Sequence, residues 1–194
     1  MFGCQAFGFE PDSISVAKAL SSAYMPIAAL TVPEPMYRSM LDESRKIGTF
    51  GHGFTYSGHP VAAAVAIKTL EIYKRDRIFE TAAARMPLFQ KRLMALGEHP
   101  LVGDARGMGL VGALELAADK RKKQPFDPKK GAGAQVVRHA EAEGLIVRVI
   151  AGDIISICPP MIIAPAEINE LFDRLGRALD KTLDWAKREQ LLAA

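Results

Sequence analysis

Residues 27–32, IAALTV, form a continuous apolar run that stops at Pro33. A run of this length is typical of a β-strand buried on both faces, which requires covering layers above and below a sheet. A second candidate strand, SISVA at residues 13–17, alternates apolar and small polar side chains just before it. Helices and strands intermix along the rest of the chain, so the fold class is α/β or α+β.

The remaining pattern predicts several more elements. Helices are expected over residues 33–44, 60–76, 78–96, 133–144 and onward from Pro165, and further strands over residues 106–116, 145–149 and 154–158. Apolar side chains at helical spacing predict two buried stripes, Phe79, Ala82, Met86, Phe89 and Leu93 on one helix, and Ile168, Leu171, Phe172, Leu175, Leu179 and Leu183 on another. A domain boundary is expected at the charged junction KRDR, which divides residues 1–75 from residues 76–194.

Composition narrows the class of protein. The 194 residues are 49% hydrophobic and 24% charged, with a net charge of +3, which is the balance of a globular protein and gives no reason to expect nucleic acid or an anionic membrane as partner. The charged run at 119–130 holds two acids, two prolines and one aromatic, so a solvated loop is expected there. Cys4 and Cys158 are too few and too far apart for a disulfide framework or a metal site, and a reducing cytoplasm fits best.

Lys18 directly follows the first predicted strand. A lysine held away from water at the end of a strand can act as a nucleophilic amine, which is what covalent binding of an aldehyde cofactor requires. We therefore expect Lys18 to point into a cleft. The alternative is an ordinary lysine in solvent, which is where most lysines lie.

The segment GTFGHGFTYSGHP, residues 48–60, is a glycine-rich loop that leads into a predicted helix. Backbone N–H groups and hydroxyls in front of a helix can bind a phosphate, although the spacing matches neither a P-loop nor a dinucleotide fingerprint. An ordinary turn with a capping residue explains the same residues. His52 and His59 are not at metal-ligand spacing, so we interpret them as structural and predict no metal.

Arg148 lies inside the apolar strand LIVRV. An arginine there either faces solvent or reaches into a pocket to bind a carboxylate through two parallel hydrogen bonds. The sequence leaves both readings open.

Four blocks of the chain together resemble the class III pyridoxal-phosphate-dependent aminotransferases, in the family's order and at its spacing. The blocks are AKALSSAYMPIAAL (17–30), GHGFTYSGHPVAAAVA (51–66), GDARGMGLVGALELAADK (103–120) and GLIVRVIAGDIISICPPMII (144–163). The sequences of the first two blocks resemble those of the ω-amino-acid and amine:pyruvate transaminase branch of this family.

The resemblance implies a fold and roles for three residues. The fold is the type I, aspartate-aminotransferase-like architecture, with residues 1–75 in the large cofactor-binding domain and residues 76–194 in the α+β small domain. Lys18 is then the Schiff-base lysine for pyridoxal 5'-phosphate, which also moves the proton between substrate and cofactor. Thr55 binds the cofactor phosphate from the neighbouring subunit of a homodimer. Arg148 is the mobile arginine that binds a substrate carboxylate.

The resemblance also implies that the chain is the C-terminal part of such an enzyme. Family members are more than twice as long, and their upstream half supplies a phosphate loop, a ring-stacking aromatic and the aspartate that pairs with the pyridine nitrogen. We therefore expect residues 13–17 and 27–32 to belong to a larger, mostly parallel sheet, and residues 1–75 to depend on a partner for order. Three functions stay open: amino transfer from an amine or amino acid to a keto acid, a non-catalytic fragment that needs the missing half, and a sister reaction such as decarboxylation.

Overall fold

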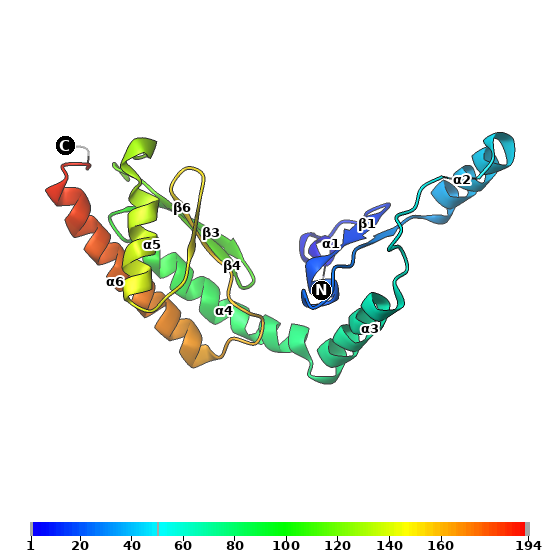
Figure 1. Cartoon of the computed structure of the whole chain (residues 1–194). Helices are drawn as coiled ribbons and strands as arrows, with labels where there is room; N and C mark the ends of the chain where they lie inside the picture. Colours follow the sequence, from blue (N-terminus) through cyan, green and yellow to red (C-terminus); the bar gives the residue numbers. More distant parts are fainter. Residues whose placement is uncertain (1, 50, 193–194) are drawn as a thin grey trace. The chain divides into compact units, whose positions relative to one another are not determined.

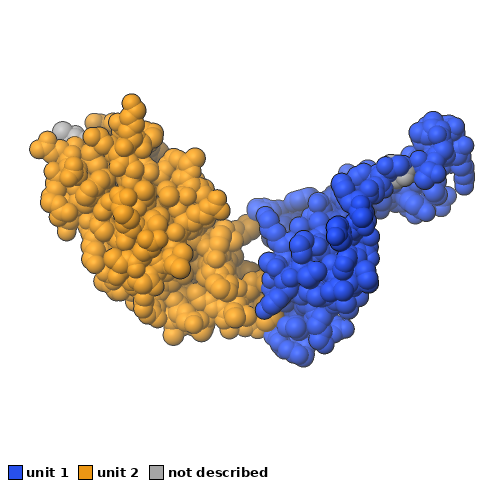
Figure 2. All heavy atoms as spheres, in the orientation of Figure 1, with its two compact units in different colours: residues 1–77 blue, residues 78–194 orange. Residues whose placement is uncertain are grey.

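The computed structural model describes residues 2–49 and 51–192. The chain divides into two compact units, with the division between Arg77 and Ile78. Figure 2 colours the two units separately. Each unit has its own sheet, so the chain is α/β with two independent sheets.

Unit 1 is built from short strands and longer helices (Figure 1). Its elements are α1 (Gly3–Phe7), β1 (Ile14–Val16), the 3-10 helix η1 (Lys18–Leu20), β2 (Ala29–Thr31), α2 (Glu34–Ile47) and α3 (Pro60–Arg75). Strands β1 and β2 pair antiparallel, with Ile14 opposite Thr31. The Thr31 hydroxyl accepts a hydrogen bond from the Ile14 N–H at 3.0 Å, which fixes this end of the pair.

One expectation for unit 1 is wrong within this chain. Strand β2 was expected to be buried on both faces, yet all three of its residues are exposed. The two strands pair antiparallel with each other, and their membership of a larger, mostly parallel sheet, whose other strands were expected upstream of this chain, stays a prediction. Burial on both faces requires a covering layer on each side. With β1 as its one strand neighbour, β2 has no such layers.

Unit 2 is a two-layer structure of a four-stranded antiparallel sheet and three helices. Its elements are α4 (Ile78–Leu96), β3 (Val102–Met108), β4 (Val111–Leu116), the 3-10 helix η2 (Pro128–Lys130), α5 (Ala132–Ala142), β5 (Arg148–Ile150), β6 (Ile154–Ile157) and α6 (Pro165–Arg188). The strand order is β3-β4-β6-β5. The helices lie on one face of the sheet, as Figure 1 shows, and the opposite face carries exposed side chains such as Val111 and Ile150.

The core of unit 2 lies between α4, α6 and the sheet. Phe89 and Phe172 are almost fully buried and meet edge to face, with ring centroids 5.1 Å apart. The predicted stripe on α6 is confirmed, since Ile168, Phe172, Leu175 and Leu179 are all buried. On α4 the prediction holds for Ala82, Phe89 and Leu93, whereas Met86 is 36% exposed.

The strand predicted over residues 106–116 is in fact a hairpin. Strand β3 ends at Met108, the chain turns at Gly109 and Leu110, and β4 begins at Val111. Gly109 has a φ of 64°, in the left-handed region that glycine adopts at little cost. Because apolar residues lie on both sides of the turn, the sequence pattern predicted one continuous strand.

Two neutral histidines hold α6 against its neighbours. His139 on α5 lies 2.9 Å from the Thr182 hydroxyl, and that hydroxyl donates its own proton to the Ala178 carbonyl at 2.7 Å. The His139 proton is therefore on Nδ1, and Nε2 accepts from the Gln135 amide at 2.9 Å. Burial, followed by the nearby Lys181 ammonium, lowers the pKa of His139.

His99 is fixed in the neutral form by a different contact. Its Nδ1 accepts the Leu101 N–H at 3.1 Å, so its proton is on Nε2, which lies 3.4 Å from an Asp180 carboxylate oxygen. This distance is within ion-pair range, but a charged ring would need a second proton on Nδ1, where the Leu101 N–H already points. Burial lowers the pKa of His99, and this outweighs the attraction of Asp180.

We expect these histidines to make unit 2 less stable at mildly acidic pH. A histidine with a folded-state pKa below its ordinary 6.5 binds fewer protons folded than unfolded. The contribution of these histidines to the free energy of unfolding should therefore be complete above pH 6.5 and should decrease as the pH drops below 6.5. Urea unfolding of the chain at pH 7.5, 6.5 and 5.5 measures the effect.

The control is the double variant His99→Asn, His139→Gln, which should show a flatter profile over the same range. Glu143 does not confound this window. The Lys181 and Arg177 side chains lower the pKa of Glu143 to about 2, so its contribution is lost only as the pH falls from 4.5 toward 2. An equally steep profile in the double variant would show that other groups cause the loss.

Two isoleucines give a matched test of the core. Ile155 on β6 is fully buried, whereas Ile146 is 90% exposed. We expect Ile155→Ala to lower the free energy of unfolding by ~2–5 kcal/mol, because it leaves a cavity in the core. Ile146→Ala should change it by no more than ~0.5 kcal/mol. Denaturant titration of both variants followed by circular dichroism would check this, and equal losses would contradict the placement of the core.

Candidate functional site

Lys18 lies two residues beyond the end of β1, where it opens η1. Its backbone is left-handed, with a φ of 51°, and the nearby Ser22 and Ala23 are also left-handed, at 50° and 63°. For residues other than glycine this conformation costs on the order of 1–2 kcal/mol each. Such strain persists only where the surroundings hold it, and it is concentrated at functional sites.

Hydrogen bonds hold the turn that contains Lys18, which we call the Lys18 turn and define as residues 17–25. The Lys18 carbonyl accepts the N–H groups of Ser21 and Ala23, both at 3.2 Å. Ser21 is 1% exposed, and its hydroxyl donates to the Met25 carbonyl at 2.6 Å. The Tyr73 hydroxyl, on α3, donates to the Ala19 carbonyl at 2.9 Å. The turn is therefore closed on itself and anchored to a helix.

The Lys18 side chain is exposed. It makes no hydrogen bond or ion pair to any residue in 2–49 or 51–192, so no described carboxylate holds its ammonium group in one position. The expectation that Lys18 points into a cleft away from water is therefore not met within this chain. Among the described residues the turn is bonded to α3 through Ala19, on a side where Ser21 is buried, whereas the Lys18 side chain itself is exposed.

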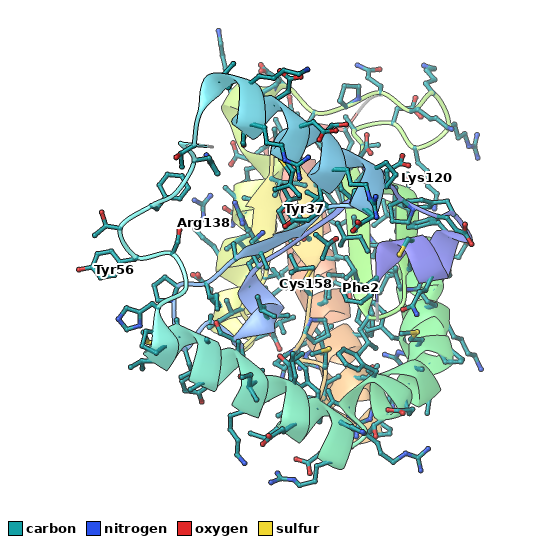
Figure 3. All side chains as sticks on the ribbon, turned by 90° about the vertical axis from the view of Figure 1, so that its right-hand side faces the viewer. Phe2, Tyr37, Tyr56, Lys120, Arg138 and Cys158 are labelled. Carbon is teal, nitrogen blue, oxygen red and sulfur yellow. The ribbon has the colours of Figure 1, made fainter. Side chains whose placement is uncertain are left out.

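Thr55 lies in an exposed loop that leads into α3. Residues 51–58 are all exposed, and the loop is closed by the Ser57 N–H, which donates to the Phe54 carbonyl at 2.8 Å. The Ser57 hydroxyl accepts the Phe54 N–H at 3.1 Å, and His59 caps α3. Figure 3 shows Tyr56, the next residue after Thr55, pointing outward from this loop. The loop and the helix N-terminus together form a place where an anion is favourable.

Helix α3 separates Lys18 from Thr55. The Lys18 turn is bonded to α3 near its C-terminal end, at Tyr73, and the Thr55 loop enters its N-terminal end at Pro60. A rise of ~1.5 Å per residue puts Tyr73 ~20 Å along the helix from Pro60. The two predicted site residues share unit 1, and the segments that carry them attach near opposite ends of α3.

Arg148 is the first residue of β5, an edge strand of the unit 2 sheet. It stands opposite Ser156 and alternates with Val149, which packs toward the helices. The Arg148 side chain is exposed on the face that the helices leave open. It makes no hydrogen bond or ion pair to the described residues, so its guanidinium group is available to an anionic ligand.

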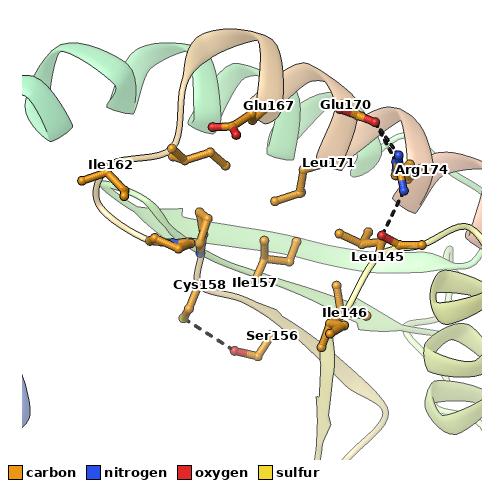
Figure 4. Close-up of a pocket in the computed structure, with 15 residues that line it drawn as sticks. Leu145, Ile146, Ser156, Ile157, Cys158, Ile162, Glu167, Glu170, Leu171 and Arg174 are labelled. Carbon is orange, nitrogen blue, oxygen red and sulfur yellow. Dashed lines mark hydrogen bonds and ion pairs between the residues drawn. The ribbon is translucent and has the colours of Figure 1, made fainter. Parts of the chain in front are cut away.

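A pocket of about 680 Å³ in unit 2 lies between the start of β5, the end of β6 and the first turns of α6 (Figure 4). Its walls combine apolar and polar groups, and its charged side chains are engaged: Arg174 binds Glu170 and the Gly144 carbonyl, and Glu167 accepts the Ala164 N–H. Lys18, Thr55 and Arg148 do not line it. We therefore place the candidate chemistry at the three exposed residues and not in this pocket.

Two further residues support the Lys18 turn and were not predicted from the sequence, Ser21 and Tyr73. Tyr73 follows Ala62, Ala66 and Thr69 in the buried column of α3. A tyrosine that follows small residues on the buried face of a helix is expected to be buried as well. Its hydroxyl is then expected to form a hydrogen bond, because the O–H of a buried tyrosine usually has a hydrogen-bond acceptor. The sequence held no comparable signal for Ser21, since its neighbour Ser22 is identical and exposed.

Within the described part of the chain, no cluster of three or more His, Cys, Asp or Glu side chains could hold a metal ion. The same residues include no helix that is long and apolar enough to cross a membrane. The loop at 119–130 is mostly exposed, as its composition predicted, and Asp119 accepts the N–H groups of Arg121 and Lys122. Phe126 is the exception, because it is buried in the core of unit 2.

Comparison with known proteins gives consistent matches. The family model for class III aminotransferases matches residues 1–179. The chain is 46% identical over 182 residues to the chloroplastic gamma aminobutyrate transaminase 3 of Solanum lycopersicum, covering 94% of this chain and 35% of the relative. It is 43% identical to a probable mitochondrial gamma-aminobutyrate transaminase 3 of Oryza sativa subsp. indica, covering 94% of this chain and 36% of the relative.

A solved structure agrees in fold. The ω-transaminase from Pseudomonas jessenii in complex with PMP superposes with a TM-score of 0.90 at 41% identity, covering 96% of this chain and 41% of that one. The chain therefore has the fold of part of a pyridoxal-phosphate-dependent transferase, as the resemblance predicted. It spans about a third of the length of the curated relatives.

The two adjacent serines test what holds the Lys18 turn. We expect Ser21→Ala to weaken the turn by ~1–2 kcal/mol, because it removes a buried hydrogen bond to Met25. Amide exchange at residues 20–24 should then accelerate roughly 5–30-fold. Ser22→Ala, at an exposed position with the same left-handed backbone, is the control and should leave exchange unchanged. Similar acceleration in both variants would mean that the Ser21 hydroxyl has no special part.

Proposed function

Since this chain belongs to the class III aminotransferase family, we propose that it supplies the C-terminal part of a transaminase that moves an amino group from an ω-amino acid or amine to a keto acid such as pyruvate. The observation that carries the proposal is the Lys18 turn. A lysine on a strained, anchored turn at a strand end, with no carboxylate partner among the described residues, is suited to react through its amine.

The family depends on pyridoxal phosphate, and the residues present fit part of that group. In the proposal, Lys18 provides the amine for covalent attachment, and the Thr55 hydroxyl, beside the N-terminus of α3, binds the phosphate. The cofactor, when bound, supplies the electron sink for the chemistry at the substrate carbon. Lys18 then carries a proton on its amine to and from that carbon.

The separation of Lys18 and Thr55 supports a site shared between subunits. The Lys18 turn is bonded to α3 at Tyr73 and the Thr55 loop enters α3 at Pro60, and these two attachment points are ~20 Å apart along the helix. We propose a homodimer in which the Thr55 loop of one copy serves the Lys18 of the other. The exposed apolar side chains of α2 and of the Thr55 loop, which include Ile47, Phe54 and Tyr56, fit such an interface.

Arg148 is proposed to select substrates that carry a carboxylate. Its guanidinium group is exposed and unpaired among the described residues, so it can bind a carboxylate through two parallel hydrogen bonds and move aside for an amine without one. The compartment remains a proposal as well. Both cysteines are free, which fits a reducing cytoplasm.

The alternative is that this chain alone is a non-catalytic fragment that requires the rest of the enzyme. It is favoured by the exposure of Lys18 and of all three β2 residues. Both readings make the same assignment for Lys18 and differ in whether the chain by itself holds the cofactor productively.

We expect added pyridoxal phosphate to give the purified chain a visible absorption band that is absent from Lys18→Ala. Reduction with borohydride, digestion and mass spectrometry should then find the cofactor attached to Lys18. A folded chain without the band would favour the fragment reading. Attachment spread evenly over exposed lysines would argue against Lys18 as the reacting amine.

For the active enzyme, we expect Arg148→Ala to reduce kcat/KM for γ-aminobutyrate far more than for a primary amine without a carboxylate. Loss of a two-point charged contact should cost ~2–4 kcal/mol of transition-state binding for the acid alone, or roughly 30–1000-fold. Arg148→Lys keeps the charge without the planar fork and should fall in between. Equal losses for both donors would exclude Arg148 as the carboxylate ligand.

A further inference from the structure

We infer that Tyr73 is a positioning residue for Lys18: through its hydrogen bond to the Ala19 carbonyl it holds the backbone from which the Lys18 amine projects. The inference rests on the proposed function only in taking Lys18 as the reacting amine. It assigns to α3 the task of fixing that amine relative to the helix.

The contact joins parts of the chain that are 54 residues apart, at a distance of 2.9 Å from the Tyr73 hydroxyl oxygen to the Ala19 carbonyl oxygen. Ala19 directly follows Lys18, so its carbonyl lies in the next peptide unit, which is joined to the Lys18–Ala19 peptide unit through the Ala19 Cα. Tyr73 is 9% exposed. A buried tyrosine cannot easily swing to another rotamer, so its hydroxyl is a fixed point for the turn.

The strain in the turn explains why a fixed point is needed. Lys18, Ser22 and Ala23 are all left-handed, and a free peptide would relax from this conformation. The Ser21 hydroxyl closes the far side of the turn on Met25, whereas the Tyr73 hydroxyl ties its near side to a different element. With the near side released, the turn could still close on itself but its orientation on α3 would no longer be fixed.

The hydroxyl can be removed without removing the packing. Phenylalanine keeps the ring in the buried column of α3, and the Ala19 carbonyl keeps its second hydrogen bond, from the Ser22 N–H at 3.3 Å. Tyr73→Phe should therefore fold. Tyr37→Phe is the matched control, because Tyr37 lies on α2 in the same unit and is 48% exposed.

The experiment has two readouts on the unmodified chain, Tyr73→Phe and Tyr37→Phe. The first is amide exchange at residues 20–24. The second is the rate of pyridoxal phosphate attachment at Lys18, trapped by borohydride and divided by the rate at Lys91, an exposed lysine on α4. In the trapped reaction the lysine nitrogen bonds to the aldehyde carbon, water leaves with the aldehyde oxygen, and hydride from borohydride reduces the resulting carbon–nitrogen double bond.

We expect Tyr73→Phe to raise exchange at residues 20–24 about fivefold and to lower the Lys18-to-Lys91 ratio by a similar factor, as the loss of one neutral hydrogen bond implies. Tyr37→Phe should change neither. Unchanged exchange would show that the contact does not hold the turn. Faster exchange with an unchanged ratio would reduce Tyr73 to a structural residue and overturn the inference.

Failure of the proposed function has a different signature. It would appear in the unmodified chain, as attachment no faster at Lys18 than at Lys91. The comparison of Tyr73→Phe with the unmodified chain would still decide whether Tyr73 sets the geometry of Lys18.

Discussion

The burial of one apolar stripe on α6 determines unit 2. Phe172 packs on Phe89 of α4 while Ile168, Leu175 and Leu179 continue the same face, so a single helix joins the other helices and the sheet into one core. The sheet can then be solvated on its far side, because an antiparallel sheet needs only one covered face. Arg148 is exposed for this reason: it alternates with Val149, and the core takes Val149. The availability of the guanidinium group is thus a consequence of packing on the opposite face.

Unit 1 has no equivalent stripe. Helix α2 buries none of its residues, and large side chains such as Phe7, Tyr24 and Leu30 are more than half exposed. What the unit does organise is local: a two-stranded pair, a strained turn after it and a column of small residues on α3. Exposed apolar surface on this scale is characteristic of surfaces that meet other protein. In such a unit, local contacts can fix the backbone of each site residue. Burial of the side chains of those residues then requires contact with further protein surface.

The sequence was informative wherever one physical signal dominated. Helical spacing of apolar residues located α4 and α6, and Pro60 and Pro165 marked helix starts because proline suits a first turn. The motif resemblance led to the family and the fold. Predictions from the sequence were wrong or incomplete where the structure depends on residues that are distant in the sequence but adjacent in space. An apolar run such as that of β2 indicates that the strand is suited to burial. It does not indicate whether other parts of the protein cover the strand. The hairpin at Gly109 was not predicted because apolar residues continue through the turn. The contacts of Ser21 and Tyr73 were not predicted because they depend on which residues meet in the folded chain.

The Lys18 turn and the Thr55 loop are each ordered by contacts within the chain. The Lys18 backbone is set within one copy, by hydrogen bonds to Ser21, Ala23 and the Tyr73-bonded carbonyl of Ala19. The backbone on either side of Thr55 is likewise held within the chain, by the hydrogen bonds between Phe54 and Ser57 in the loop before α3. The same helix joins both segments, since the Lys18 turn is bonded to it at Tyr73 and the Thr55 loop enters it at Pro60. The helix therefore keeps these two attachment points ~20 Å apart along its axis, while local hydrogen bonds fix the backbone near each predicted site residue.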